Sequence, residues 1–177
     1  MLKKTLLTLT CIAMATSALA KEISIPTARG DVTLNAPPAK IAVFDTGSLD
    51  TLQALGVKVD GAADVAKVLP YLKPTLDSAK NVGTIFEPNL EALNELKPDL
   101  IIVGTRTAKK FDDVSAIAKT IDLTDNGDKL VESGIQRIDS FGRLFDKQAA
   151  ADKLKGELET LLKDTKAAVK DKGNGLI

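Results

Sequence analysis

Histidine is absent from the 177-residue sequence, and there is one cysteine, Cys11. Without histidine, and without a pair of cysteines, the chain has no disulfide framework and no Cys/His zinc site. Catalysis that depends on histidine is excluded too, and cysteine-dependent catalysis is not expected because Cys11 lies in a stretch that we expect to be removed from the mature chain. Carboxylates, Lys, Arg, Ser, Thr, one Tyr and the backbone are left for chemistry.

Excess charge of either sign is also missing, because 24 basic side chains balance 24 acidic ones. A nucleic-acid partner is therefore not expected, since phosphate binding depends on a basic excess. The glycine strings that bind dinucleotides or nucleoside triphosphates do not occur. Asp112 and Asp113 are adjacent and point to different faces of a helix, so they form no acid/base pair. We expect no enzyme activity, no metal site and no cofactor of the protein's own.

The first twenty residues have the pattern of a secretory signal peptide. Lys3 and Lys4 precede an uncharged, largely apolar stretch, and Ala18 and Ala20 supply the small residues that signal peptidase reads. The stretch is too short and too rich in Thr and Ser for a membrane span. We expect cleavage after Ala20, no lipid on Cys11, and a periplasmic mature protein.

The remainder alternates short apolar runs with helical patterns, which predicts an α/β fold with a parallel or mixed sheet. A hairpin is expected first, within 21–40. Strands are expected at 40–44, 57–59, 100–103 and 120–123, and helices at 49–55, 90–96, 108–118 and 130–144, the last interrupted at Gly142. A polar loop is expected around Pro70 and Pro74, and Asn89 is a helix N-cap.

The last predicted element is a helix over 146–172 with an apolar stripe at spacings of three and four, ended by Gly173. Such a helix is longer than one face of a small α/β lobe needs. Residues 174–177 then resemble the start of another turn and strand.

Two segments carry a family resemblance: NVGTIFEPNLEAL at 81–93 and LKPDLII at 96–102. With IAVFDTGSLDTLQALG at 41–56 and GTR at 104–106, they make the chain similar to periplasmic binding proteins of iron-siderophore ABC importers. The resemblance is strongest to the catecholate subgroup. It implies two α/β lobes joined by a rigid helix, with the ferric siderophore held between them.

The resemblance divides the chain into a signal peptide (1–20), a Rossmann-like N-terminal lobe with a mostly parallel sheet (21–143), an interlobe helix (144–173) and the start of a second lobe (174–177). Family members are usually close to three hundred residues long, so the resemblance implies that this chain is a truncated form. The implied partners are a ferric catecholate siderophore and an inner-membrane ABC permease. An exported scaffold, a non-binding fragment and a binder of cobalamin or haem are alternatives.

Arg106 is the first candidate for ligand binding, because it follows a buried strand and the resemblance implies an arginine facing the anionic chelate. Its alternative is a solvated ion pair with Asp112 or Asp113. Thr46 and Gly47 follow the first strand of the sheet and are also ordinary turn residues. Tyr71, in a proline-flanked loop, is a ligand candidate or a packing residue.

Glu91 lies in the first turn of its expected helix, where the helix dipole favours a carboxylate. The resemblance implies that a glutamate at this position docks on arginines of the permease. Helix capping and docking are compatible roles for Glu91. Glu87 is the second candidate for the same contact.

Overall fold

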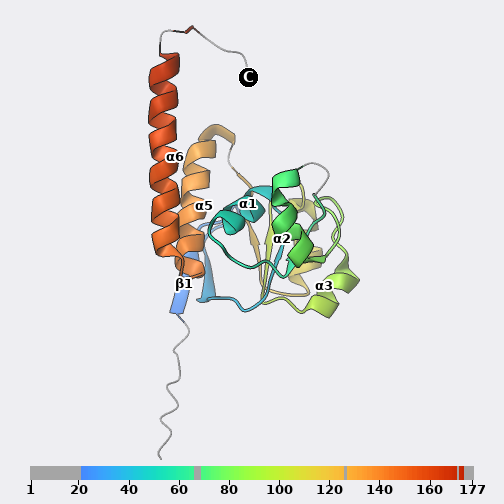
Figure 1. Cartoon of the computed structure of the whole chain (residues 1–177). Coiled ribbons are helices and arrows are strands. Elements are labelled where there is room, and N and C mark those ends of the chain that lie inside the picture. Colours follow the sequence, from blue (N-terminus) through green and yellow to red (C-terminus); the bar gives the residue numbers. More distant parts are fainter. Residues whose placement is uncertain (1–20, 66–68, 126, 171, 174–177) are drawn as a thin grey trace, which may run out of the picture.

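The computed structural model describes residues 21–65, 69–125, 127–170 and 172–173 (Figure 1). The expected signal peptide and residues 174–177 lie outside these described residues. The strands are β1 (Lys21–Ile25), β2 (Val32–Ala36), β3 (Ile41–Val43), β4 (Gly61–Ala62), β5 (Lys80–Asn81), β6 (Leu100–Val103) and β7 (Thr120–Asp122). The α-helices are α1 (Thr46–Ala54), α2 (Lys73–Ser78), α3 (Leu90–Leu96), α4 (Phe111–Ser115), α5 (Leu130–Leu144) and α6 (Gln148–Val169), and the 3₁₀ helices are η1 (Pro70–Leu72), η2 (Ala108–Lys110) and η3 (Gly127–Lys129).

A five-stranded sheet in the order β5-β4-β3-β6-β7 forms the centre of the fold. Every pairing in it is parallel, and Ile41 faces Leu100 where the two central strands meet. The connections run outward in one direction from β3 to β5 and in the other from β6 to β7. The direction therefore reverses between β3 and β6, and in sheets of this kind ligands bind outside the carboxyl ends of the strands at such a reversal.

Apolar side chains cover both faces of this sheet, as its two central strands require. All residues of β3 and β6 are buried, which matches their lack of polar alternation. One face packs on the β1–β2 hairpin, α1, α5 and α6, with Leu49, Leu52 and Phe141 among its buried residues. The other packs on α3 and α4 through Leu93 and Val114. This three-layer arrangement confirms the predicted α/β class. No helix among the described residues is long and apolar enough to span a membrane.

Helices α5 and α6 form an antiparallel pair along one side of the lobe (Figure 1). The chain reverses at Asp146, whose φ is 55°. A Cβ on Gly142 would lie 2.5 Å from that of Ala151, so the missing side chain lets the two helices approach closely. Asp139 of α5 accepts hydrogen bonds from Arg143 (3.1 Å) and from Lys155 of α6 (3.0 Å). The pair is thus joined by close packing and by charge.

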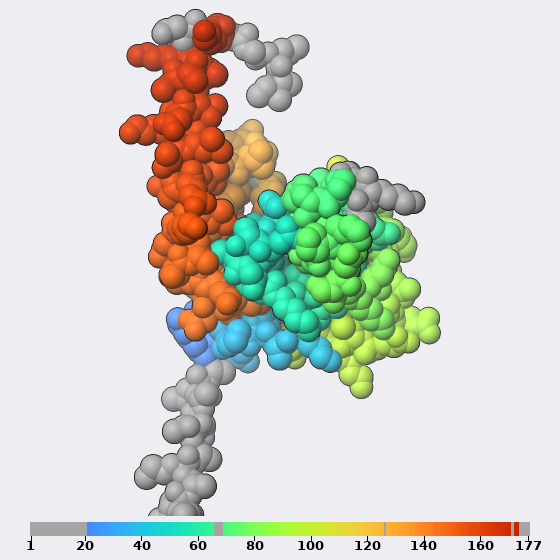
Figure 2. Space-filling view, viewed as in Figure 1, coloured from blue at the N-terminus to red at the C-terminus, as the bar shows by residue number. Residues whose placement is uncertain are grey.

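Helix α6 extends beyond its partner. It has 22 residues where α5 has 15, a difference of about 10 Å at 1.5 Å per residue. Ala151, Leu154 and Leu158 pack on the core, whereas Leu161 is 64% exposed and Val169 53% exposed. Figure 2 shows the outer part of α6 standing clear of the lobe.

Three sequence predictions about local structure were wrong. The second strand is not at 57–59 but at Gly61–Ala62, because the amide of Val57 still bonds the helix carbonyl of Leu52 and pairing with β3 begins only at Asp60. The expected loop around Pro74 contains η1 and α2, each with a proline in its first turn, where proline is tolerated. Helix α5 runs through Gly142 without interruption.

Candidate functional site

The loops after β3 and β6 line an open pocket of about 500 Å³ at the carboxyl ends of these strands. Its lining is Phe44, Asp45, Thr46, Gly47, Ile85, Gly104, Thr105, Arg106 and Asp125. Three residues singled out in the sequence, Thr46, Gly47 and Arg106, therefore come together at the reversal point of the sheet. Ile85 and Asp125 extend the lining from the loops after β5 and β7.

The Arg106 side chain is exposed and carries an unneutralised charge. Its guanidinium lies over the Phe86 ring, 5.6 Å from the centroid. Within the described residues no carboxylate lies in ion-pair distance of it, and Asp112 and Asp113 do not pair with it. A guanidinium without a carboxylate partner keeps its planar fork of donors available for an anion.

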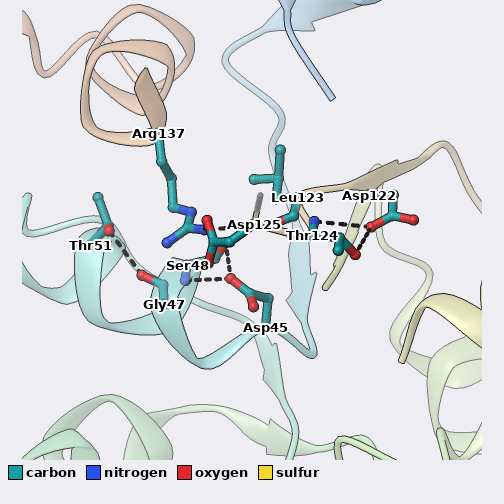
Figure 3. Close-up of polar contacts among 9 residues, drawn as sticks. All are labelled: Asp45, Gly47, Ser48, Thr51, Asp122, Leu123, Thr124, Asp125 and Arg137. Carbon is teal, nitrogen blue, oxygen red and sulfur yellow. Dashed lines mark hydrogen bonds and ion pairs between the residues drawn. The ribbon is translucent and has the colours of Figure 1, made fainter. Parts of the chain in front are cut away.

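Asp45 forms the floor of the pocket and begins helix α1. Its Oδ2 accepts hydrogen bonds from the amide and the hydroxyl of Ser48, both at 2.7 Å (Figure 3). Burial raises the pKa of Asp45, against the opposing effect of nearby Arg137 and of the Ser48 hydrogen bonds. A Cβ on Gly104 would lie 2.3 Å from Asp45 Oδ1, so glycine is needed where β6 ends beside this carboxylate.

Arg137 of α5 lies behind the floor and joins three segments (Figure 3). Its Nη2 donates to Asp125 at 2.5 Å and to the Leu123 carbonyl at 3.4 Å. Its Nη1 lies against Gly47, where a Cβ would be 2.4 Å away. Only 10% of the Arg137 side chain is exposed. Gly47 thus has a packing reason to be glycine, besides lining the pocket.

Sequence reasoning missed Arg137 and Asp125. The only signal was an arginine within an otherwise amphipathic helix, and amphipathic helices usually carry arginine on the solvent face. The ion pair between Arg137 and Asp125 depends on the packing of α5 against the first turn of α1, which the sequence does not show.

The two candidate permease contacts differ in their surroundings. Glu87 accepts a hydrogen bond from Lys110 at 3.0 Å. Glu91 is exposed in the first turn of α3, and no cation pairs with it in the described part of the chain. As predicted, the helix is capped by Asn89, whose Oδ1 accepts from the Ala92 amide at 2.9 Å. Of these two candidates, Glu91 is therefore the one without an ion-pair partner among the described residues.

Tyr71 does not join the pocket lining. It lies in η1, is 55% exposed, and its carbonyl accepts a hydrogen bond from Gln53. A ligand contact by Tyr71 stays a prediction. Among the described residues no group of His, Cys, Asp and Glu side chains is arranged to hold a metal ion.

A parallel sheet with a pocket at its reversal point, followed by a long helix that extends beyond the lobe, defines an α/β lobe with a candidate ligand site. The chain belongs to the periplasmic binding protein family, whose model matches residues 41–175. Members of this family bind substrates rather than transform them.

Two similar curated proteins carry petrobactin or siderophore binding in their names. The petrobactin-binding protein YclQ of Bacillus subtilis is 39% identical over 146 residues, which are 79% of this chain and 45% of that protein. The probable siderophore-binding lipoprotein YfiY of the same organism is 44% identical over 90 residues, or 49% of this chain and 28% of its own length. The chain thus spans at most about half the length of these curated relatives.

Solved structures agree with this similarity. The crystal structure of YclQ superposes with a TM-score of 0.78 at 29% identity, covering 88% of this chain and 56% of that one. The periplasmic catecholate-siderophore binding protein VctP of Vibrio cholerae gives 0.77 at 26% identity, with 85% and 55% covered. The predicted class of two-lobed binding proteins is confirmed for the half that this chain matches.

Proposed function

We propose that this chain is the first ligand-binding lobe (21–143) and the interlobe helix (144–173) of an exported ferric-siderophore binder that serves an ABC permease. The observation that carries the proposal is Arg106, a guanidinium with no ion-pair partner among the described residues, in the lining of a pocket at the reversal point of the sheet. The names of the similar proteins supply the substrate class. The role is binding, not catalysis.

The chemistry of a ferric catecholate suits this site. The iron is fully ligated by the siderophore, so the protein needs no metal ligands and no cofactor of its own. What it must offer is a counter-charge to the delocalised anionic oxygens, and a planar guanidinium does so with charge-assisted hydrogen bonds. Thr46 and the backbone around Gly47 provide the polar surface opposite Arg106.

Delivery to the permease falls to Glu91 in this proposal. A free, exposed carboxylate can pair with a cation of a partner without first giving up an internal ion pair, whereas Glu87 must release Lys110. Charges at such a rim set register and encounter rate more than affinity. In cells that depend on this transport system for iron, Glu91→Arg should therefore slow uptake of radioactive iron more than Glu87→Arg does.

The decisive experiment is a titration of the purified chain with iron(III) tris(2,3-dihydroxybenzoate), followed by visible absorbance. Arg106→Ala should weaken binding by about 10- to 100-fold, because a charge-assisted hydrogen bond contributes ~1.5–3 kcal/mol. Lys109→Ala is the matched control: it removes a neighbouring exposed charge outside the pocket lining and should change binding little. Equal weakening by both variants would show that Arg106 acts only through the overall charge of the surface and makes no specific contact. Absence of binding by the wild type would contradict the proposal.

A further inference from the structure

We infer that Phe86 is a specificity-determining residue, an aromatic platform that holds Arg106 and selects ligands whose iron-binding groups are aromatic rings. The inference rests on the proposed function and names a residue that neither the sequence motifs nor the pocket lining single out.

The Phe86 ring is exposed without being loosely held. It is 60% exposed, yet the loop that carries it is fixed by its own hydrogen bonds. Thr84 Oγ1 accepts from the amides of Phe86 (3.3 Å) and Glu87 (3.0 Å), and the Thr84 amide bonds the Glu87 carbonyl at 3.0 Å. Because burial of the ring is not what orders this loop, the ring remains available to a ligand.

The Phe86 loop is also tied to the loop that carries Arg106. Thr107, next to Arg106 and fully buried, donates its hydroxyl to the carbonyl of Ile85, next to Phe86, at 2.5 Å. Lys110 and Glu87 form a second link at 3.0 Å. These two contacts lie on either side of the Arg106–Phe86 pair and hold the two loops next to each other, so the fold brings the guanidinium and the ring together.

The pair offers two kinds of surface side by side. Ile85 lines the pocket, and Phe86 continues this apolar surface outward beneath the guanidinium. Contact with the ring orders the Arg106 side chain and leaves its charge in place. A carboxylate partner would order the side chain but would also neutralise its charge. With its Cζ 5.6 Å from the ring centroid, the guanidinium is oriented by the Phe86 ring and its donors stay available to a ligand.

A catecholate carries both complementary features in one group: anionic oxygens for Arg106 and a flat ring for Phe86. Hydroxamates and citrate offer oxygens to the guanidinium but no ring. Aromatic pairs add ~0.5–1.5 kcal/mol beyond the area they bury, which corresponds to about 2- to 10-fold in affinity. Phe86 should thus favour catecholate chelates over aliphatic ones by that factor.

The test compares three probes on four proteins. Iron(III) tris(2,3-dihydroxybenzoate), ferric citrate and ferric Desferal are titrated into the wild type, Phe86→Leu, Phe86→Tyr and Leu161→Ala, the last removing an equally exposed apolar side chain far along α6. Phe86→Leu should weaken the catecholate complex by about 3- to 10-fold and the other two by no more than about twofold, while Phe86→Tyr and Leu161→Ala stay within about twofold of wild type.

A second measurement needs no ligand. In the ligand-free protein, the side-chain resonances of Arg106 should show an upfield ring-current shift that is lost in Phe86→Leu and kept in Phe86→Tyr. Absence of that shift in the wild type, or equal weakening of all three probes by Phe86→Leu, would overturn the inference. Catecholate binding unaffected by Phe86→Leu would overturn the platform alone, whereas a wild type that binds none of the probes would overturn the proposed function and the platform together.

Discussion

At the scale of single residues, the site depends on the identity of a few small side chains as much as on its charges. Gly47 and Gly104 leave the space that Arg137 and Asp45 occupy. The pocket floor is therefore built from close contacts between backbone and charged side chains. Substitutions that add one methyl group can test this directly.

Gly47→Ala should lower the free energy of unfolding by about 1–3 kcal/mol, the usual cost of overpacking. The added Cβ would collide with Arg137 Nη1, and a shifted guanidinium would lose its bond to Asp125. Chemical denaturation measures the change. Gly134→Ala is the matched control, since nothing lies within 4 Å of its Cβ position in α5 and it should stabilise by about 0.5–1 kcal/mol. A Gly47→Ala variant as stable as wild type would show that Arg137 has room to move.

Arg106→Lys separates charge from geometry at the same scale. The ammonium keeps the positive charge but lacks the planar fork, so it should recover only part of the affinity lost in Arg106→Ala. Thermal stability should hardly change in either variant, because the guanidinium is exposed and has no ion-pair partner among the described residues. Unchanged affinity with a lower melting temperature would identify Arg106 as structural.

At the scale of elements, the α5–α6 pair depends on the charge cluster around Asp139. Hydrogen bonding from Lys155 holds the pKa of Asp139 below its ordinary value. The carboxylate therefore stabilises the folded state at pH values above the ordinary aspartate pKa of about 4. This contribution is lost as the pH falls through the lowered folded-state pKa.

Asp139→Asn should accordingly be less stable than wild type at neutral pH, and the difference should shrink below about pH 4. Urea denaturation followed by far-UV circular dichroism at several pH values measures it. Asp164→Asn serves as control, because Asp164 is exposed on α6 with no ion pair among the described residues. A wild-type advantage that is independent of pH would exclude the carboxylate charge as its source.

The elements themselves were largely predictable from local signals. The apolar run at Leu100–Val103 predicts a buried strand, and Asn89 predicts the start of a helix, each from a few neighbouring residues. The position of β4 was not predictable, because Val57 and Val59 fit a strand by propensity while pairing with β3 decides the outcome. Gly142 also gave a false signal: glycine indicates a break by propensity, but here it permits contact with Ala151.

The candidate site was predictable in its strand-end residues and not in its supports. Thr46, Gly47 and Arg106 follow apolar runs, and the carboxyl ends of parallel strands share one edge. Arg137 reaches Gly47, and Phe86 reaches Arg106, only through packing between segments that are apart in sequence. No local pattern encodes which turn of α5 faces α1, or which loop lies beneath Arg106.

At the scale of the whole molecule, the described pocket has one wall. Ligand sites normally bury 70–90% of a small molecule, and a single lobe covers about half of it. We expect the 177-residue chain to bind iron(III) tris(2,3-dihydroxybenzoate) about a thousandfold more weakly than full-length YclQ binds its own chelate, since ~4 kcal/mol of contact is missing. Isothermal titration of both proteins tests this, and comparable affinities would show that one lobe is sufficient.

The export prediction also belongs to this scale. Mature protein isolated from the periplasm should begin at Lys21, because the small residues before it suit signal peptidase. Intact mass spectrometry decides the point. A species that retains residues 1–20, or that carries lipid on Cys11, would contradict the prediction.

The length of α6 determines how far its C-terminal end extends beyond the edge of the sheet that carries the pocket. Because α5 starts from the loop after β7, at the carboxyl edge of the sheet, and α6 runs antiparallel to it, the overhang of about 10 Å rises on the ligand side. The outer end of α6 at Val169 therefore lies beyond the start of α5 on the side of the sheet where the pocket opens. Removing one turn from the outer half would lower that point by about 5 Å, while removing two residues would swing it to the opposite side of the helix axis. The number of turns in α6 therefore sets how far its C-terminal end lies above the pocket edge of the sheet.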